Sequence, residues 1–158
     1  MAEQEIYAIV RLRGEPDTHH SIRKTLSLLR LHKVNHAVVY PKTSSLEGML
    51  FKAKDKITWG TVDKPTLVHL LRKRGELIGK RKLTDEYIKE NTEYGSIEEF
   101  VDAVFDGKAK LTDIPDLKPV FRLSPPRKGF KSLKHSYNDK GDLGFRGENM
   151  KNLIMRMA

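Results

Sequence analysis

The chain has 158 residues, about the length of one domain, and its 38% of hydrophobic residues is enough for a buried core. Its formal net charge of +9 favours a polyanionic partner such as a nucleic acid. The sequence contains no cysteine, which excludes disulfides, thiolate metal sites and cysteine nucleophiles.

The first 62 residues carry the pattern of a small sheet with helices. Apolar residues alternate from Ile6 to Leu12, as in a strand with one buried side, and later β-rich runs predict two more strands. Ile22, Leu26 and Leu29 recur at helical spacing, and serines precede a second short helical run. The β-α-β-α-β order implies right-handed crossovers and helices packed on one face of the sheet. The predicted strands span 5–12, 35–40 and 56–62, and the predicted helices span 19–31 and 44–54.

The middle of the chain is predicted to be helical. Pro65 suits the first turn of a helix, and Gly75 suits its end. Thr84 is a candidate N-cap for the next helix. Ser96 and Glu99 fit a reciprocal capping box in front of an apolar stripe that a glycine ends.

The C-terminal part combines an edge strand with a basic segment. Residues 118–123 predict a strand at a sheet edge, because Pro119 has no N–H to donate. Residues 124–149 hold few large aliphatic side chains, so we expect them to order on a partner. A last apolar stripe at helical spacing implies docking on a core: Met150, Leu153, Ile154 and Met157.

Charge is segregated along the chain. Residues 1–83 have a net charge of +9, residues 84–116 of −7 and residues 117–158 of +7. This segregation predicts that the basic parts touch a polyanion while the acidic part faces solvent or a basic neighbour, of which we favour solvent. The pattern divides one structural domain into a core over 1–62, a helical extension over 63–116 and a basic C-terminal segment over 117–158.

No motif for catalysis or for a cofactor is present. The six histidines lack the H-E-x-x-H spacing and the nearby carboxylates of a metal site. Walker, dinucleotide-binding and nucleophile-elbow sequences are absent. Paired acids such as Glu98 and Glu99 lie at helix starts, where they complement the helix dipole. We therefore expect no enzyme activity, no cofactor, no metal and no small-molecule substrate.

Two basic triplets occur in the helical extension. Residues 72–74 close a predicted helix, where the dipole favours cations, but residues 80–82 have no such explanation. Cations packed this densely repel each other unless an anionic partner is present. The triplets therefore predict contact with a polyanion.

The basic C-terminal segment interleaves cations with Phe130, Tyr137 and Phe145. Cations neutralise phosphates, and aromatic rings stack on unpaired bases, so this pattern is typical of RNA binding. Trp59 is a further candidate for stacking, although a buried tryptophan is the commoner outcome in a strand.

Six stretches resemble the ribosomal protein L-thirty family of the large subunit, called L-seven in its eukaryotic form. The first three are IYAIVRLRG, IRKTLSLLRLHKVNHAVVYPKT and LEGMLFKAKDKITWG. The later three are FRLSPPRKGF, KGDLGFRG and NLIMRM. Their order and spacing cover nearly the whole chain. Because the first strand lies so near the start of the sequence, the chain resembles archaeal members, and we expect it to be without the long basic extension of eukaryotic ones.

The resemblance implies a small ferredoxin-like α/β (α+β) fold and no catalysis. It implies binding to large-subunit ribosomal RNA near the 5S RNA, with neighbouring ribosomal proteins as further partners. Glu47 departs from bacterial members, which commonly carry an arginine before the glycine, so no phosphate contact is carried over to this position.

We expect phosphate contacts from cations in all three parts of the chain, with counterion release and recognition of shape. The predicted RNA-binding residues are Arg11, Arg13, Arg23, Lys24, Arg30, Lys33, Lys42, Lys52, Lys54, Arg72, Arg74, Arg81, Arg127, Lys128, Lys131, Lys134 and Arg146.

Other functions remain open from the sequence. A free-standing translational regulator on messenger RNA is compatible with the same fold. A DNA-binding architectural protein is less well supported, because no helix-turn-helix or dimerisation heptad is evident. Since no secretory signal and no run of roughly 18 apolar residues is present, we expect a cytoplasmic protein without a membrane partner.

Overall fold

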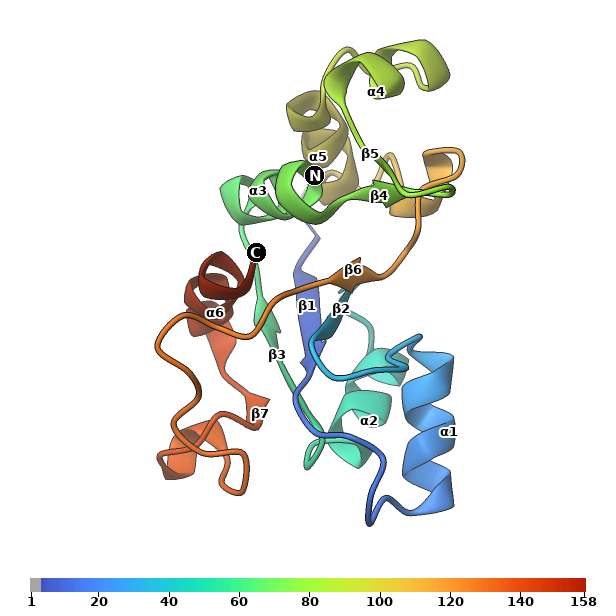
Figure 1. The fold of residues 1–158 in the computed structure, drawn as a ribbon. Coiled ribbons are helices and arrows are strands. Elements are labelled where there is room, and N and C mark those ends of the chain that lie inside the picture. Colours follow the sequence, from blue (N-terminus) through green and yellow to red (C-terminus); the bar gives the residue numbers. More distant parts are fainter. Residues whose placement is uncertain (1–3) are drawn as a thin grey trace.

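The computed structural model describes residues 4–158 and is built around a five-stranded sheet (Figure 1). The order of the strands is β6-β2-β1-β3-β7. Helices cover this sheet, so the predicted α/β (α+β) class is confirmed. The strands are β1 (Ile6–Arg11), β2 (His36–Pro41), β3 (Ile57–Thr61), β6 (Phe121–Arg122) and β7 (Gly144–Phe145).

The helices follow the predicted order, and one hairpin was not predicted. The helices are α1 (His20–Leu28), α2 (Ser44–Lys52), α3 (Lys64–Arg74), α4 (Asp85–Asn91), α5 (Ile97–Phe105) and α6 (Met150–Met157). A separate antiparallel hairpin joins β4 (Glu76–Leu77) to β5 (Arg81–Lys82). It carries the second basic triplet on its return strand and turn.

The pairing of the core strands corrects one expectation. β1 runs antiparallel to both of its neighbours, with Ala8 opposite Val39 on β2 and opposite Gly60 on β3. The rule of right-handed crossovers concerns parallel strands, so it does not describe the connection from β1 through α1 to β2. The connection from β2 through α2 to β3 does join parallel strands, and it spans the intervening β1.

Both faces of the sheet are covered (Figure 1). All six residues of β1 are buried. Tyr7 and Ile9 pack with α1 and α2, as expected for helices on one face. Ile6, Ala8 and Val10 share the opposite side, as predicted, and there they pack with α3, α5 and α6. The extension therefore completes the core that a short sheet with two helices would leave half open.

The caps of the extension helices are largely as predicted. Thr84 accepts a hydrogen bond from the Tyr87 amide at the start of α4. Ser96 accepts one from the Glu99 amide, but the Glu99 carboxylate accepts from Gly95 N and not from the cap residue itself. The capping box is therefore displaced by one residue.

Two glycines are required for close approach. Gly75 ends α3 at φ −64°, so its role is space and not a left-handed turn: a Cβ there would lie 2.3 Å from Leu71 O. A Cβ on Gly60 in β3 would lie 2.2 Å from the carbonyl oxygen of Gly147. That contact brings the turn before α6 against the sheet.

The C-terminal elements dock as the apolar stripe predicts. Met150, Leu153, Ile154 and Met157 are all buried in the core that α3 and α5 also share. β6 pairs with β2 at the sheet edge, as predicted from Pro119. The basic segment between them returns to the sheet through β7, which pairs parallel to β3.

Candidate nucleic-acid interface

Cations on α1 and the turn that follows it are exposed. Arg23, Lys24, Arg30 and Lys33 make no ion pair with any residue in 4–158. The apolar side of α1 packs on the sheet through Leu26, so these polar side chains are turned outward. Arg30 adopts the left-handed conformation at φ 65° directly after the helix. This side of the molecule therefore presents uncompensated positive charge to a partner.

The end of α2 adds two more exposed cations, Lys52 and Lys54. Lys54 Nζ lies 4.5 Å from the centroid of the Phe51 ring, in a cation–π contact. Phe51 is 66% exposed, although it is a large aromatic residue on a short helix. Sequence reasoning missed Phe51, and the available indication was its place on the polar side of the α2 pattern.

Arg13 and Lys42 flank these helices, and only Lys42 is paired with carboxylates. Arg13 is half-buried in the loop before α1 and has no ion pair among the described residues. Lys42 is paired with Glu5 at 2.9 Å and lies 3.7 Å from Glu47. The hydrogen bond to Glu5 raises the pKa of Lys42. Lys42 is therefore less free for a phosphate than its position in the sequence suggested.

The basic triplet at the end of α3 is largely engaged by the protein itself. Arg72 pairs with Asp85 at 3.1 Å and with Glu98 at 3.2 Å. Arg74 donates to Ser124 Oγ at 2.7 Å and to two backbone carbonyls. The acidic segment thus neutralises part of the neighbouring basic one, so the alternative of a basic neighbour holds here over the favoured solvent face.

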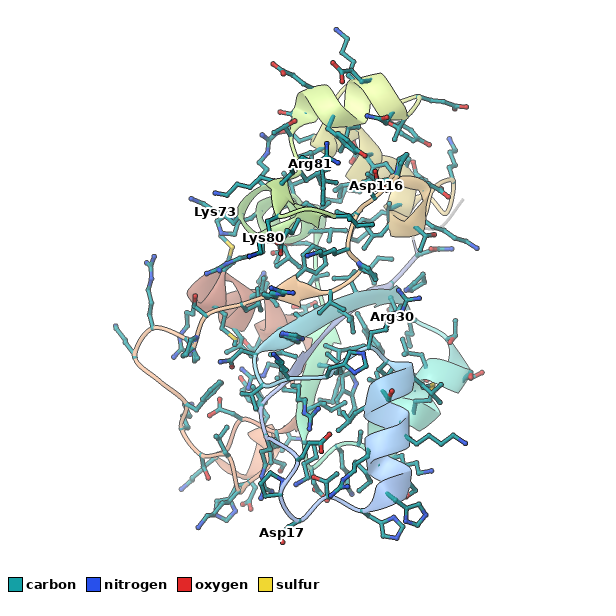
Figure 2. The ribbon with its side chains drawn as sticks, turned by 45° about the vertical axis from the view of Figure 1, so that its right-hand side comes forward. Asp17, Arg30, Lys73, Lys80, Arg81 and Asp116 are labelled. Carbon is teal, nitrogen blue, oxygen red and sulfur yellow. The ribbon has the colours of Figure 1, made fainter. Side chains whose placement is uncertain are left out.

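The hairpin triplet is more open. Arg81 lies 3.9 Å from Asp116, and the two are near each other in Figure 2, which also labels Lys73 and Lys80 on the same part of the molecule. Lys80, Arg81 and Lys82 are all exposed. Lys80 adopts φ 62° in the turn beside Gly79. The sequence identified this triplet, but only the structure places it on a hairpin.

The C-terminal segment holds a second group of free cations. Arg127, Lys128, Lys131 and Lys134 are exposed, and none has an ion pair within residues 4–158. Of the three aromatic residues in this segment, Phe130 packs partly on the core, while Phe145 remains 48% exposed. Phe145 lies at the sheet edge with its ring centroid 6.2 Å from that of Trp59. Trp59 itself is buried, the commoner outcome noted above.

Two of the predicted RNA-binding residues lie inside the protein. Arg11 is 2% exposed, and its guanidinium donates to Leu31 O and to Arg13 O, each at 2.8 Å. Burial lowers the pKa of Arg11, partly opposed by Glu15. These bonds join β1 to the end of α1, so Arg11 holds the basic loop and helix in place and is not itself presented to a partner.

Arg146 is the second buried case and anchors the basic segment. It donates to Thr58 Oγ1 at 2.9 Å and to Asp142 O at 2.7 Å, and it pairs with the Asp142 carboxylate at 3.1 Å. Burial lowers the pKa of Arg146, and Asp142 opposes that shift. Thr58 in turn donates to Gly144 O at 2.8 Å. Sequence reasoning missed Asp142, whose carboxylate pairs with the arginine that is bonded to Thr58 of β3.

The sequence also gave no indication of the cations that surround His36 near β6. Burial lowers the pKa of His36, and Arg122 and Lys33 lower it further. Arg122 lies opposite His36 in the β2–β6 pairing. Strands β2 and β6 and the turn that carries Lys33 thus bring positive charge together around His36. Because these parts are not all close in the sequence, spacing alone does not reveal this.

The described residues hold neither a metal-ligand cluster nor a membrane-spanning helix. Between residues 4 and 158, no group of three or more His, Cys, Asp or Glu side chains is placed to hold a metal ion. Within the same range, no helix has the length and apolar character needed to cross a membrane.

Comparison with known proteins identifies the family. A family model described as ribosomal protein L30p/L7e matches residues 7–57. The large ribosomal subunit protein uL30 of Archaeoglobus fulgidus is 54% identical over 152 residues, which cover 96% of this chain and 99% of that protein. The chain belongs to the ribosomal protein L30p/L7e family.

Further relatives extend over the same length. The uL30 protein of Staphylothermus marinus is 49% identical over 159 residues, covering 97% of this chain and 98% of its own. The uL30 protein of Methanocorpusculum labreanum is 46% identical over 152 residues, with 96% and 99% coverage. Similarity to the L30p/L7e family therefore includes α3 to α6 as well as the sheet core, in an archaeal type of member.

Proposed function

We propose that this chain is a structural constituent of the large ribosomal subunit that binds ribosomal RNA. The observation that carries the proposal is its near full-length similarity to proteins named large ribosomal subunit protein uL30. Its place is then in the ribosome, with other ribosomal proteins as neighbours. Its contribution is positional: a rigid domain that neutralises phosphates of folded RNA and releases their counterions.

The free cations define the proposed RNA-binding surface. On one side these are residues of the loop before α1, of α1 and its turn, and of the end of α2. On the other side they belong to the C-terminal segment. The proposed contacts are Arg13, Arg23, Lys24, Arg30, Lys33, Lys52, Lys54, Arg127, Lys128, Lys131 and Lys134.

The other residues predicted to bind RNA make their main contacts within the protein. Arg11 and Arg146 shape the surface from inside, and Lys42, Arg72, Arg74 and Arg81 are engaged by carboxylates or carbonyls. We propose contact with RNA near the 5S RNA as the finer placement, on the basis of the family resemblance. We also propose that the protein performs no catalysis, which predicts that RNA incubated with it stays chemically unchanged.

The organisation that supports this role is a single structural domain. We propose that the segments 1–62, 63–116 and 117–158 fold as one unit. In support, one buried cluster contains Val10 of the first segment, Phe100 of the second and Leu153 of the third. A truncation before α6 would expose this core, so point substitutions test the RNA contacts better than deletion does.

A sucrose gradient of cell extract, run at moderate and then at high salt, tests the function. We expect the protein to sediment with the large subunit at both salt concentrations. A free small protein at the top of the gradient would contradict the proposal. It would favour instead a free-standing regulator that binds messenger RNA.

A further inference from the structure

A basic pocket of about 370 Å³ opens between the C-terminal segment and the start of α6. Its wall includes four cations and one carboxylate, that of Asp142. A volume of this size lies in the range of small-ligand sites, about 300–1,000 Å³. The cations are Lys128, Lys131, Arg146 and Arg156.

The two arginines build the pocket, and the two lysines remain free. Arg156 donates to Arg127 O and to Gly129 O, each at 2.6 Å, which ties α6 to the loop. Arg146 pairs with Asp142, whose carboxylate also accepts from the amides of Lys131 and Ser132. The only carboxylate of the pocket is thus satisfied. The charge of Lys128 and Lys131 is left uncompensated at its mouth.

Lys128 occupies an unfavourable backbone conformation at this mouth. Its φ is +66°, next to Gly129 at φ +70°. A lysine at such a position is strained relative to glycine or asparagine. Asn149 and Asn152 line the same pocket, and their side-chain amides make no hydrogen bond to residues 4–158. Uncompensated charge and unused side-chain amides therefore meet in this pocket.

We propose that this pocket binds one nucleotide of the large-subunit RNA. Its phosphate lies between Lys128 and Lys131, and its ribose 2′-hydroxyl faces the amides of Asn149 and Asn152. Lysine is a common phosphate ligand, and side-chain amides both donate to and accept from hydroxyls. The inference rests on the proposed function and names one nucleotide-sized contact within it.

A pair of matched substitutions tests the pocket in the full chain. Lys128→Asn removes the charge and keeps a residue that tolerates the left-handed conformation. Lys140→Asn makes the same change at an exposed lysine with φ 60° in the same segment, outside the pocket. We expect Lys128→Asn to weaken binding of large-subunit RNA about tenfold and to lower the salt slope by roughly 0.7–0.9, as for one phosphate contact. Lys140→Asn should change affinity by about twofold or less.

The possible outcomes distinguish a failure of the pocket proposal from a failure of the proposed function. If the unmodified chain fails to prefer large-subunit RNA over unrelated RNA, the proposed function itself fails. If it binds but the two variants weaken it equally, only the pocket is wrong. If Lys128→Asn binds RNA normally yet enters subunits poorly, a neighbouring protein occupies the pocket and the inference is overturned. Thermal unfolding should show both variants as stable as the parent chain.

A small probe tests the same pocket without folded RNA. Adenosine 5′-monophosphate is titrated into the isotope-labelled full chain and amide NMR shifts are followed, with adenosine as the ligand that lacks the phosphate. We expect shifts at Gly129, Lys131 and the side-chain amides of Asn149 and Asn152 with the nucleotide only. Shifts spread over all exposed lysines, or equal shifts with adenosine, would overturn the proposal.

Discussion

The α1–α2 side of the molecule and the α3–α5 extension both carry many cations, but the two regions differ in how far these cations are paired with carboxylates. On α1, Arg23 and Lys24 have no ion pair among the described residues. In the extension, Arg72 is shared by Asp85 and Glu98, and Arg81 lies near Asp116. The difference shows that local charge density does not determine what a surface offers. What a surface offers to a partner depends on the carboxylates that folding places next to its cations.

The largest expected effect is a loss of stability when Arg146, a cation already paired inside the protein, is replaced. Arg146→Met leaves the Asp142 carboxylate buried without its partner. Removing one member of a buried pair costs about 3–5 kcal/mol of the free energy of unfolding. Urea denaturation of the free protein measures this loss. Arg127→Met, at an exposed and unpaired arginine of the same segment, is the control and should stay within about 0.5 kcal/mol. Equal losses in both would show that the Arg146 network does not anchor the segment.

The next largest expected effect is a loss of RNA affinity when exposed cations without an ion pair among the described residues are replaced. The triple change Arg23→Gln, Lys24→Gln and Arg30→Asn removes three proposed phosphate contacts. Asparagine is chosen at Arg30 because of its positive φ. We expect roughly 10- to 100-fold weaker binding and a salt slope lower by about 2, with little change in stability. Filter binding across a salt series measures both.

A control with the same change in net charge sharpens this comparison. Arg72→Gln, Lys89→Gln and Lys110→Gln remove three cations from the extension. We expect less than about threefold loss of RNA affinity, because these residues are paired or lie in the acidic region. If the two triple variants weaken binding equally, net charge and not the α1 surface governs the interaction.

A smaller effect follows from releasing cations of the extension. Glu98→Gln and Asp116→Asn together remove one of the two carboxylates paired with Arg72 and the carboxylate near Arg81. Affinity for generic RNA at low salt should rise about two- to fivefold, while stability changes by no more than about 1 kcal/mol, since surface ion pairs contribute little. The control is Glu90→Gln with Glu93→Gln, two exposed carboxylates without an ion pair among residues 4–158. An identical rise in the control would mean that pairing is irrelevant.

The smallest effect concerns pH. The pKa of His36 is lowered in the folded protein by burial and then by Arg122 and Lys33, so the unfolded chain binds a proton at higher pH than the folded one. Stability is therefore expected to fall as the pH drops below the ordinary histidine value of about 6.5. His36→Gln should reduce the difference in unfolding free energy between pH 7.5 and pH 5.5. His20→Gln, at an exposed histidine, is the control, and an equal reduction there would contradict the assignment.

The sequence by itself determined much of this protein, because local rules suffice for its elements. The alternation from Ile6 to Leu12 marks a strand whatever it pairs with, and Thr84 and Ser96 cap helices through bonds to amides a few residues away. The apolar stripe of α6 required a core, which burial of Leu153 and Ile154 confirms. The family resemblance also rests on linear motifs.

Only the tertiary structure decided the pairing of β1, the role of each cation and the basic pocket. The antiparallel arrangement depends on where β1 inserts between β2 and β3, which periodicity does not encode. Arg146 and Lys128 look alike in the sequence, yet Arg146 is buried against Thr58 across the fold while Lys128 is exposed, and unpaired among the described residues, in the lining of the pocket. Hydrogen bonds and ion pairs act over a few ångströms in space, and Thr58 and Arg146 become neighbours only when the chain has folded.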